Sequence, residues 1–304
     1  MIFLLVSTMG FIIPFQSAIA GRLGQRLKSS YLSSFLSCLC ASLTAFVITF
    51  ISKGSVLIPD NILVQFSSLL WTAGVFFAIG TTLLIYVIPK IGGMLCVVLP
   101  LLGQIITSIL IEHWGLFSVP RKAITSSTFI SVLCLLVGVF LVISSKTKTK
   151  QKSEIHKIDY FLAFIAGISM ALQFIITGKV GQLLHSSPHA AMFTFIEASL
   201  CLLVFLAFHF RKKESVALFS KEKIPNWMYI SGILLAFILP TNALASSLIG
   251  PNLTVIISLL SQLLAGVIID HFGLLHVKVN KINWQQITGL MLVVGSIFLL
   301  KFLS

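Results

Sequence analysis

A thirteen-residue segment occurs twice in this chain. Residues 104–116 are QIITSILIEHWGL, and residues 262–274 are QLLAGVIIDHFGL. Both copies place a glutamine eight residues before an acid, which is followed directly by histidine, an aromatic residue, glycine and leucine. A long-period repeat constrains the fold before any local pattern does, because each copy is expected to form the same structural unit.

The repeat extends beyond this segment. Residues 74–104 and 232–262 align without a gap at the same offset of 158. Upstream the offset becomes 157, where QSAIAGRLGQRLKSS (residues 16–30) matches QFIITGKVGQLLHSS (residues 173–187). The chain therefore consists of two copies of one unit.

We predict one unit at residues 1–145 and the second at residues 158–304. Residues 146–157 between them are polar and basic, without apolar periodicity, and we expect a flexible linker.

The composition indicates a membrane protein. Apolar residues make up 57% of the chain, charged residues 10%, and the mean hydropathy is +1.07. Soluble domains carry about 25% charged residues, so this chain has too little polar surface for a water-soluble globule. Ten apolar runs have about the length that crosses a bilayer. They cover approximately residues 2–20, 31–51, 64–88, 94–116, 128–144, 160–177, 190–210, 227–248, 253–275 and 284–303.

Five spans per unit is an odd number, so the second unit enters the membrane from the side opposite to the first. We therefore predict an all-α integral membrane protein of ten transmembrane helices, arranged as two inverted five-helix repeats.

The basic residues assign the sides. In this topology sixteen of the 21 Lys and Arg residues lie on the face reached after the first helix, and five on the other. The positive-inside rule makes the first face cytoplasmic. The linker is then inside and both termini are outside, in the inner (cytoplasmic) membrane of a bacterium. This distribution, and not nucleic-acid binding, accounts for the formal charge of +13.

Glu197 lies in the middle of an apolar run. An ionisable group at mid-membrane costs at least about 2.5 kcal/mol to insert, so its first interpretation is functional. Thr194 and Cys201 share its helix face at helical spacing. Dehydration favours the neutral carboxyl, so Glu197 is a candidate proton carrier. The alternative is a protonated side chain that serves packing only. The first repeat has Cys40 at the matching position.

Two glutamine pairs and one broken helix are further pathway candidates. The matched pairs are Gln104 with Gln262, near mid-membrane, and Gln16 with Gln173. Polar side chains also hold membrane helices together, so a structural role is equally open. Pro240 is expected to interrupt the eighth helix and to let Asn242 line the opening, and Pro100 acts similarly before Gln104. A kink for packing is the alternative.

The repeated acid–His–aromatic–Gly ending has two interpretations. In the first, the glycines cap helices and the aromatic residues anchor them at the membrane interface. In the second, the acids and histidines are gating groups at opposite faces. The gating candidates are Glu112, His113, Asp270 and His271.

No enzyme motif is visible. HExxH, GxSxG, a Walker loop and paired intramembrane aspartates are all missing from the sequence. The five cysteines lie in apolar runs without metal-ligand spacing, so we expect neither disulfides nor a metal, and no cofactor.

The Gln–Gly–Arg–Leu–Gly module after the first run (Gln16 and residues 21–24) and the GQ…(E/D)H(W/F)GL module in the fourth resemble the YdcZ-type branch of the drug/metabolite transporter superfamily. Its members are five-helix proteins that pair in opposite orientations, or ten-helix fusions. The resemblance covers nearly the whole chain and implies a transporter of small metabolites or drugs, without naming a substrate.

We therefore predict a secondary transporter that works by alternating access, as an exporter, with Glu197 as its candidate for proton coupling. The expected partners are a small-molecule solute and the lipid bilayer. The fused pseudo-dimer is expected to act as a monomer, with a homodimer left open. The alternative function is a non-transporting membrane scaffold or lipid-interaction protein.

Overall fold

The computed structural model describes residues 2–56, 68–118, 121, 123–144, 156–210, 225–249, 251–274 and 283–302. These residues form ten α-helices and three short 3-10 helices, and no strand occurs among them. The first half contains α1 (Ile2–Arg26), α2 (Ser30–Lys53), η1 (Ser68–Thr72), α4 (Ala73–Ile91), α5 (Leu95–Trp114), η2 (Leu116–Ser118) and α6 (Ser126–Ser144). The second contains α7 (Lys157–Leu183), α8 (Ser187–Phe210), η3 (Asn226–Tyr229), α9 (Ile230–Ile249), α10 (Pro251–Phe272) and α11 (Trp284–Phe302).

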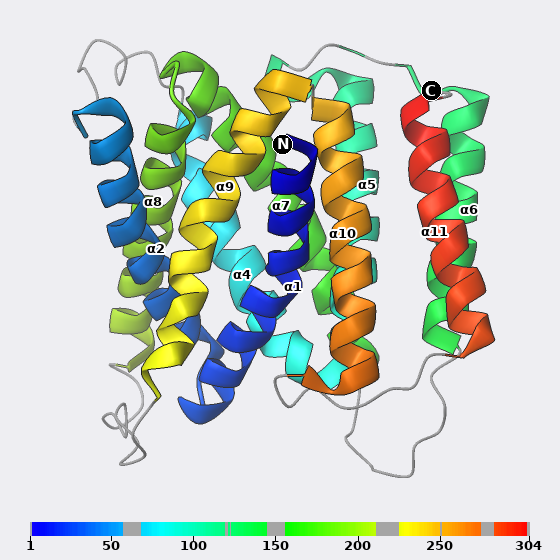
Figure 1. The fold of residues 1–304 in the computed structure, drawn as a ribbon, viewed down its shortest axis with the longest axis horizontal. Coiled ribbons are helices and arrows are strands. Elements are labelled where there is room, and N and C mark those ends of the chain that lie inside the picture. Colours follow the sequence, from blue (N-terminus) through cyan, green and yellow to red (C-terminus); the bar gives the residue numbers. More distant parts are fainter. Residues whose placement is uncertain are drawn as a thin grey trace.

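The helices form one bundle of long, roughly antiparallel rods (Figure 1). Seven of them, α1, α2 and α4–α8, are long and apolar enough to cross a bilayer, and α10 and α11 contribute shorter apolar stretches. The start of α1 and the end of α11 lie at the same end of the bundle, which we call the terminal face. The opposite end is called the distal face. The predicted linker lies outside the described residues except at its last two positions.

The predicted inversion is visible at the two ends of α5. Asp270, near the end of α10, accepts hydrogen bonds from the backbone N–H groups of Gly93 and Met94, directly before α5 begins. Its repeat equivalent, Glu112, lies in the last turn of α5. The twenty residues of α5 span about 30 Å at 1.5 Å per residue. The two equivalent acids therefore lie at opposite faces, as inverted repeats require.

Equivalent glycines make equivalent helix crossings. Gly74 of α4 lies against the backbone of Ala198 in α8, and a Cβ atom there would overlap it. Gly232 of α9 lies in the same way against α2, where a Cβ atom would overlap the carbonyl of Ser37 and the Cβ atom of Cys40. In the first crossing the third helix of the first half meets the second helix of the second half, and in the other crossing the third helix of the second half meets the second helix of the first. A pseudo-two-fold axis in the membrane plane predicts this exchange. Close approach of backbones at small residues is the usual way in which membrane helices pack.

A second pair of crossings joins the halves through α5 and α10. Gly167 of α7 lies against the carbonyl of Pro100 in α5, and Gly10 of α1 lies against the carbonyl of Ser258 in α10. The repeat relates Gly10 to Gly167 and Pro100 to Ser258. The first helix of each half therefore packs against the fourth helix of the other half. The centre of the bundle lies between these two pairs of helices.

Two expectations about prolines were wrong. Pro240 does not interrupt α9, which runs from Ile230 to Ile249, and Pro100 does not interrupt α5, which runs from Leu95 to Trp114. A proline removes one backbone hydrogen bond. Unwinding the helix in a bilayer would expose several more unsatisfied backbone groups, so the helix persists.

The first helix is longer than predicted. It extends to Arg26, six residues past the expected end, so that Arg22 lies on its last turns instead of in a loop. The Arg22 guanidinium lies 5.4 Å from the centre of the Trp227 ring. This cation–π contact ties the end of α1 to η3 of the second half at the distal face.

Candidate functional site

A cavity lies at the centre of the bundle and is lined by α1, α2, α4, α5, α7, α9 and α10. It consists of two adjoining parts that share lining residues, and the larger part holds about 750 Å³ of space without protein atoms, which includes space open to the surface. The four predicted glutamines all line it: Gln16, Gln104, Gln173 and Gln262. Helices α6 and α11 contribute none of its lining residues and pack mainly on each other.

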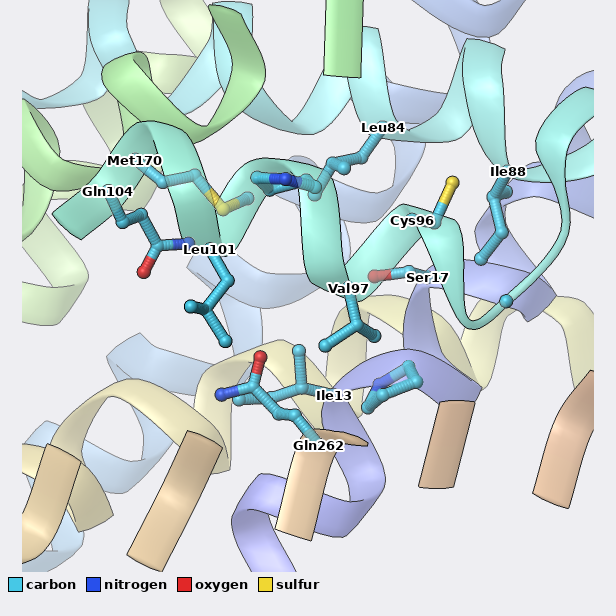
Figure 2. A pocket seen from close by; sticks show the side chains of 13 residues that line it. Ile13, Ser17, Leu84, Ile88, Cys96, Val97, Leu101, Gln104, Met170 and Gln262 are labelled. Atoms are coloured by element: carbon cyan, nitrogen blue, oxygen red, sulfur yellow. The ribbon is translucent and has the colours of Figure 1, made fainter. Parts of the chain in front are cut away.

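The pair Gln104 and Gln262 enters the cavity from opposite walls, α5 and α10 (Figure 2). Gln262 Nε2 donates a hydrogen bond to Ser258 Oγ at 3.2 Å. The structure shows no hydrogen bond from the Gln104 amide to another described residue. Its donors and acceptor are therefore turned to the cavity without a protein partner in the described part of the chain.

The pair Gln16 and Gln173 is buried more deeply. Gln16 Oε1 accepts a hydrogen bond from Ser17 Oγ at 3.2 Å, and Gln173 Nε2 donates to Thr177 Oγ1 at 2.9 Å. Because both amides are partly used inside their own helices, these residues shape the wall and still offer one end each to the cavity.

Hydroxyl groups that sequence reasoning missed complete the wall. Ser34, Ser37 and Thr81 line the cavity. Ser34 Oγ donates to Thr81 Oγ1 at 3.2 Å, and Ser37 Oγ lies 3.0 Å from Ser231 Oγ. They connect α2 to α4 and to α9. Serine and threonine are frequent in membrane helices, so the sequence carried no signal that separated these three from the others.

Glu197 does not line the cavity. Its Oε2 accepts a hydrogen bond of 2.9 Å from the backbone N–H of Gly74, the second residue of α4. Its other oxygen, Oε1, is buried without a partner among the described residues. The carboxyl thus faces the N-terminus of a helix of the first repeat, whose positive end favours negative charge.

A row of hydrogen bonds runs from the cavity toward Glu197. Thr177, which accepts from Gln173, lies 3.0 Å (Oγ1 to Oγ1) from Thr194, one helical turn before Glu197 on α8. Thr194 is buried and also donates to the carbonyl of Ala190. The predicted candidates Gln173, Thr194 and Glu197 therefore lie in sequence along one path, although only Gln173 lines the cavity.

Asn242 lies apart from these groups. It is half-buried on α9, does not line the cavity, and its Oδ1 is buried without a partner in the described part of the chain. The expected opening at Pro240 does not form because α9 stays helical.

Asp270 is almost fully buried, with 2% of its surface exposed. Its carboxylate joins α10 to the connection before α5, and Gly93, one of its donors, lines the cavity. The next residue, His271, is exposed and its ring packs edge-on against Phe272, with 5.0 Å between centroids. The acid and the histidine of this ending therefore lie in different surroundings.

At the terminal face, Glu112 is half-buried, and the Nδ1 atom of His113 is buried without a partner among the described residues. The His113 carbonyl accepts a hydrogen bond of 3.0 Å from Nε of Arg121.

The anchoring features of the repeated ending have the predicted geometry. Gly115 and Gly273 follow their helices with φ of 66° and 62°, in the left-handed region that favours glycine. Trp114 is 60% exposed and Phe272 67% exposed. The ending therefore caps each helix and presents an aromatic ring outward. In the second repeat its acid, Asp270, also accepts hydrogen bonds from the connection before α5.

An ion pair at the distal face was not predicted. Asp159 is fully buried at the start of α7, and its Oδ1 accepts from Lys90 Nζ at 3.0 Å. Lys90 Nζ also lies 3.7 Å from the centre of the Tyr86 ring. This pair joins α4 to α7 across the two halves. The sequence placed both residues at helix ends without indicating that they meet.

Within the described segments, no group of three His, Cys, Asp or Glu side chains is placed to hold a metal ion. All five cysteines are free.

Comparisons with known proteins agree with this architecture. A family model named DMT_YdcZ, described as "Putative inner membrane exporter, YdcZ", matches residues 1–141 and 159–299, one segment in each repeat. A solved structure described as "Crystal structure of protein" matches with a TM-score of 0.55 and 12% identity over 97% of each chain. At this identity the likeness concerns the fold alone. No match was found among curated proteins.

Proposed function

We propose that this chain, which belongs to the DMT_YdcZ family, exports a small metabolite or drug-like solute by alternating access. The family is one of membrane exporters and not of enzymes. The observation that carries the proposal is the central cavity, to which the inverted repeats contribute equivalent glutamines. Inverted repeats that enclose a mid-membrane site are the common plan of secondary transporters.

Alternating access predicts that one cavity position is reached from both faces. In a variant whose five native cysteines are replaced by alanine, a cysteine at Ser17 should react with an impermeant thiol reagent from outside intact cells and from the cytoplasmic side of inverted vesicles. Ser17 is suitable because it lines the cavity. A scaffold with a permanently closed cavity would leave this cysteine unlabelled from at least one face, which is the result that contradicts transport.

The basic residues support an orientation with the distal face in the cytoplasm. In the same cysteine-free background, a cysteine placed within residues 145–157 should be protected from reagent added outside, and one placed after Lys301 should be labelled. The reverse pattern would overturn this orientation and the assignment to an inner membrane with both termini outside.

We infer that Glu197 couples proton movement to solute movement. The support is its Oε1, which is buried without a partner among the described residues, and the row Gln173–Thr177–Thr194, which starts at the cavity and ends one helical turn from Glu197. Protonation of Glu197 would remove the charge of the carboxyl group that accepts a hydrogen bond from the backbone N–H of Gly74. This hydrogen bond joins α8 to α4 across the two repeats.

Replacing Glu197 with glutamine should therefore leave insertion and folding intact and remove the pH dependence of solute flux, measured over a pH series in proteoliposomes. Glutamine keeps the size of the side chain but never carries charge. Glu197→Asp should retain part of the dependence. The matched control is Cys40→Ser, at the equivalent position of the first repeat, which should keep the wild-type profile. An unchanged profile in Glu197→Gln would assign the residue to packing.

We further propose that Asp270 and Glu112 are gating groups at opposite faces. Asp270 supports this proposal because its carboxylate joins α10 to the start of α5 between the cavity and the distal face. The cavity is complete within one chain, which supports a monomer in the bilayer as the working unit.

A further inference from the structure

Among the described residues, the cavity wall carries polar groups but no charged side chain. Of the lining residues in the described part of the chain, none is acidic, basic or histidine. The polar groups are the four amides and the hydroxyls of serine and threonine, and the remaining lining residues are mostly aliphatic or aromatic.

The carboxyl groups of Asp270 and Glu197 both accept hydrogen bonds from backbone N–H groups. Asp270 binds two N–H groups before α5, and Glu197 binds the N–H of Gly74 without entering the cavity. A charged solute would therefore lose its water without gaining a counter-charge, and this loss is expensive in an apolar site.

The amides define what can bind. A primary amide offers two N–H donors and one carbonyl acceptor in a plane. Gln104 and Gln262 present such groups from facing walls, and the Gln104 amide has no partner among the described residues (Figure 2). Leu101, Val97 and Ile13 lie around them and supply apolar surface.

We propose that the cavity binds an uncharged solute with an apolar body and a planar head that carries a hydrogen-bond donor beside an acceptor, and that Gln104 and Gln262 bind this head. The inference rests on the proposed transport function and names its substrate class. A carboxamide is the simplest such head, because its donor and acceptor match those of a glutamine amide.

Three probes of nearly equal shape isolate charge. Benzamide is neutral, benzoate is an anion and benzamidinium is a cation, and all three carry a planar head on the same ring. Binding is measured by calorimetry on the purified full chain in detergent. Benzamide should bind saturably, and both ions should bind at least about fifty-fold more weakly, since burying a charge costs at least about 2.5 kcal/mol.

Two variants test the assignment to Gln104. Gln104→Met keeps the length of the side chain but removes its hydrogen bonds, and should weaken benzamide binding about three- to tenfold. Gln104→Glu adds a carboxylate and should turn the preference toward benzamidinium. Gln25→Met is the matched control, because Gln25 is exposed near the end of α1, outside the cavity.

Absence of saturable benzamide binding, tighter binding of either ion to the wild type, or an equal loss in the Gln25 control overturns the inference. These outcomes are separate from the fate of the transport proposal. If Ser17→Cys is labelled from both faces but one of the ions binds more tightly than benzamide, the transport proposal stands and the neutral substrate class is rejected. If benzamide binds but Ser17→Cys is labelled from only one face, the neutral ligand class stands and the transport proposal is rejected.

Discussion

Replacing Gly167 with alanine is expected to destabilise the protein by about 3 kcal/mol or more, near the upper end of what overpacking costs. A Cβ atom at this position would overlap the backbone carbonyl of Pro100 in α5. The neighbouring contact is equally close, because a Cβ atom at Gly103 of α5 would overlap the carbonyl of Phe164 in α7. Two backbones meet here, so no side-chain rotation relieves the overlap and the helices must separate.

A matched substitution lies on the same helix. A Cβ atom at Gly178 of α7 would meet nothing within 4 Å. Gly178→Ala should therefore be neutral or stabilise by up to about 1 kcal/mol, because alanine is the better helix former. The measurement is the fraction of monodisperse protein that survives heating in detergent, for wild type and both variants. Equal melting of the two variants would contradict the crossing of α5 and α7 described above.

The architecture could be predicted because it follows from patterns that survive in one sequence. Apolar runs gave ten helices, the 158-residue offset gave the repeat, and the odd number of spans gave its inversion. The four glutamines followed from the same repeat, since residues near the middle of equivalent helices meet around the pseudo-two-fold axis. The depth of a residue in the membrane and the helix face on which it lies can thus be predicted from its position in the repeat.

Contacts between particular side chains that are far apart in the sequence could not be predicted in this way. The sequence placed Glu197 on an inward face, but only the close approach of Gly74 determines that its carboxyl meets the start of α4 and not the cavity. The same holds for Lys90 in the last turn of α4 and Asp159 in the first turn of α7, which are 69 residues apart in the sequence. Proline was misleading for a different reason, because the bilayer penalises an unwound backbone more than one missing hydrogen bond.

Replacing Asp270 with asparagine is expected to open the cavity toward the distal face. The carboxylate accepts from two backbone N–H groups, at Gly93 and Met94. Asparagine has only one acceptor oxygen and turns an NH₂ group toward the second donor. Losing a charge-assisted hydrogen bond and leaving a buried donor unpaired costs about 3 kcal/mol. If this contact exists only when the distal face is closed, the equilibrium shifts by about a hundredfold toward the open state.

The labelling rate of Ser17→Cys from the cytoplasmic side of inverted vesicles measures this shift. In the cysteine-free background it should rise by up to about a hundredfold in Asp270→Asn. Asp159→Asn is the control, because it removes an equally buried acid at the same face. That acid joins α4 and α7, which pack along one another, so the control should lower the melting temperature but leave the labelling rate within about threefold of wild type. An unchanged rate in Asp270→Asn, or the same rise in both variants, would show that Asp270 holds the fold together without gating the cavity.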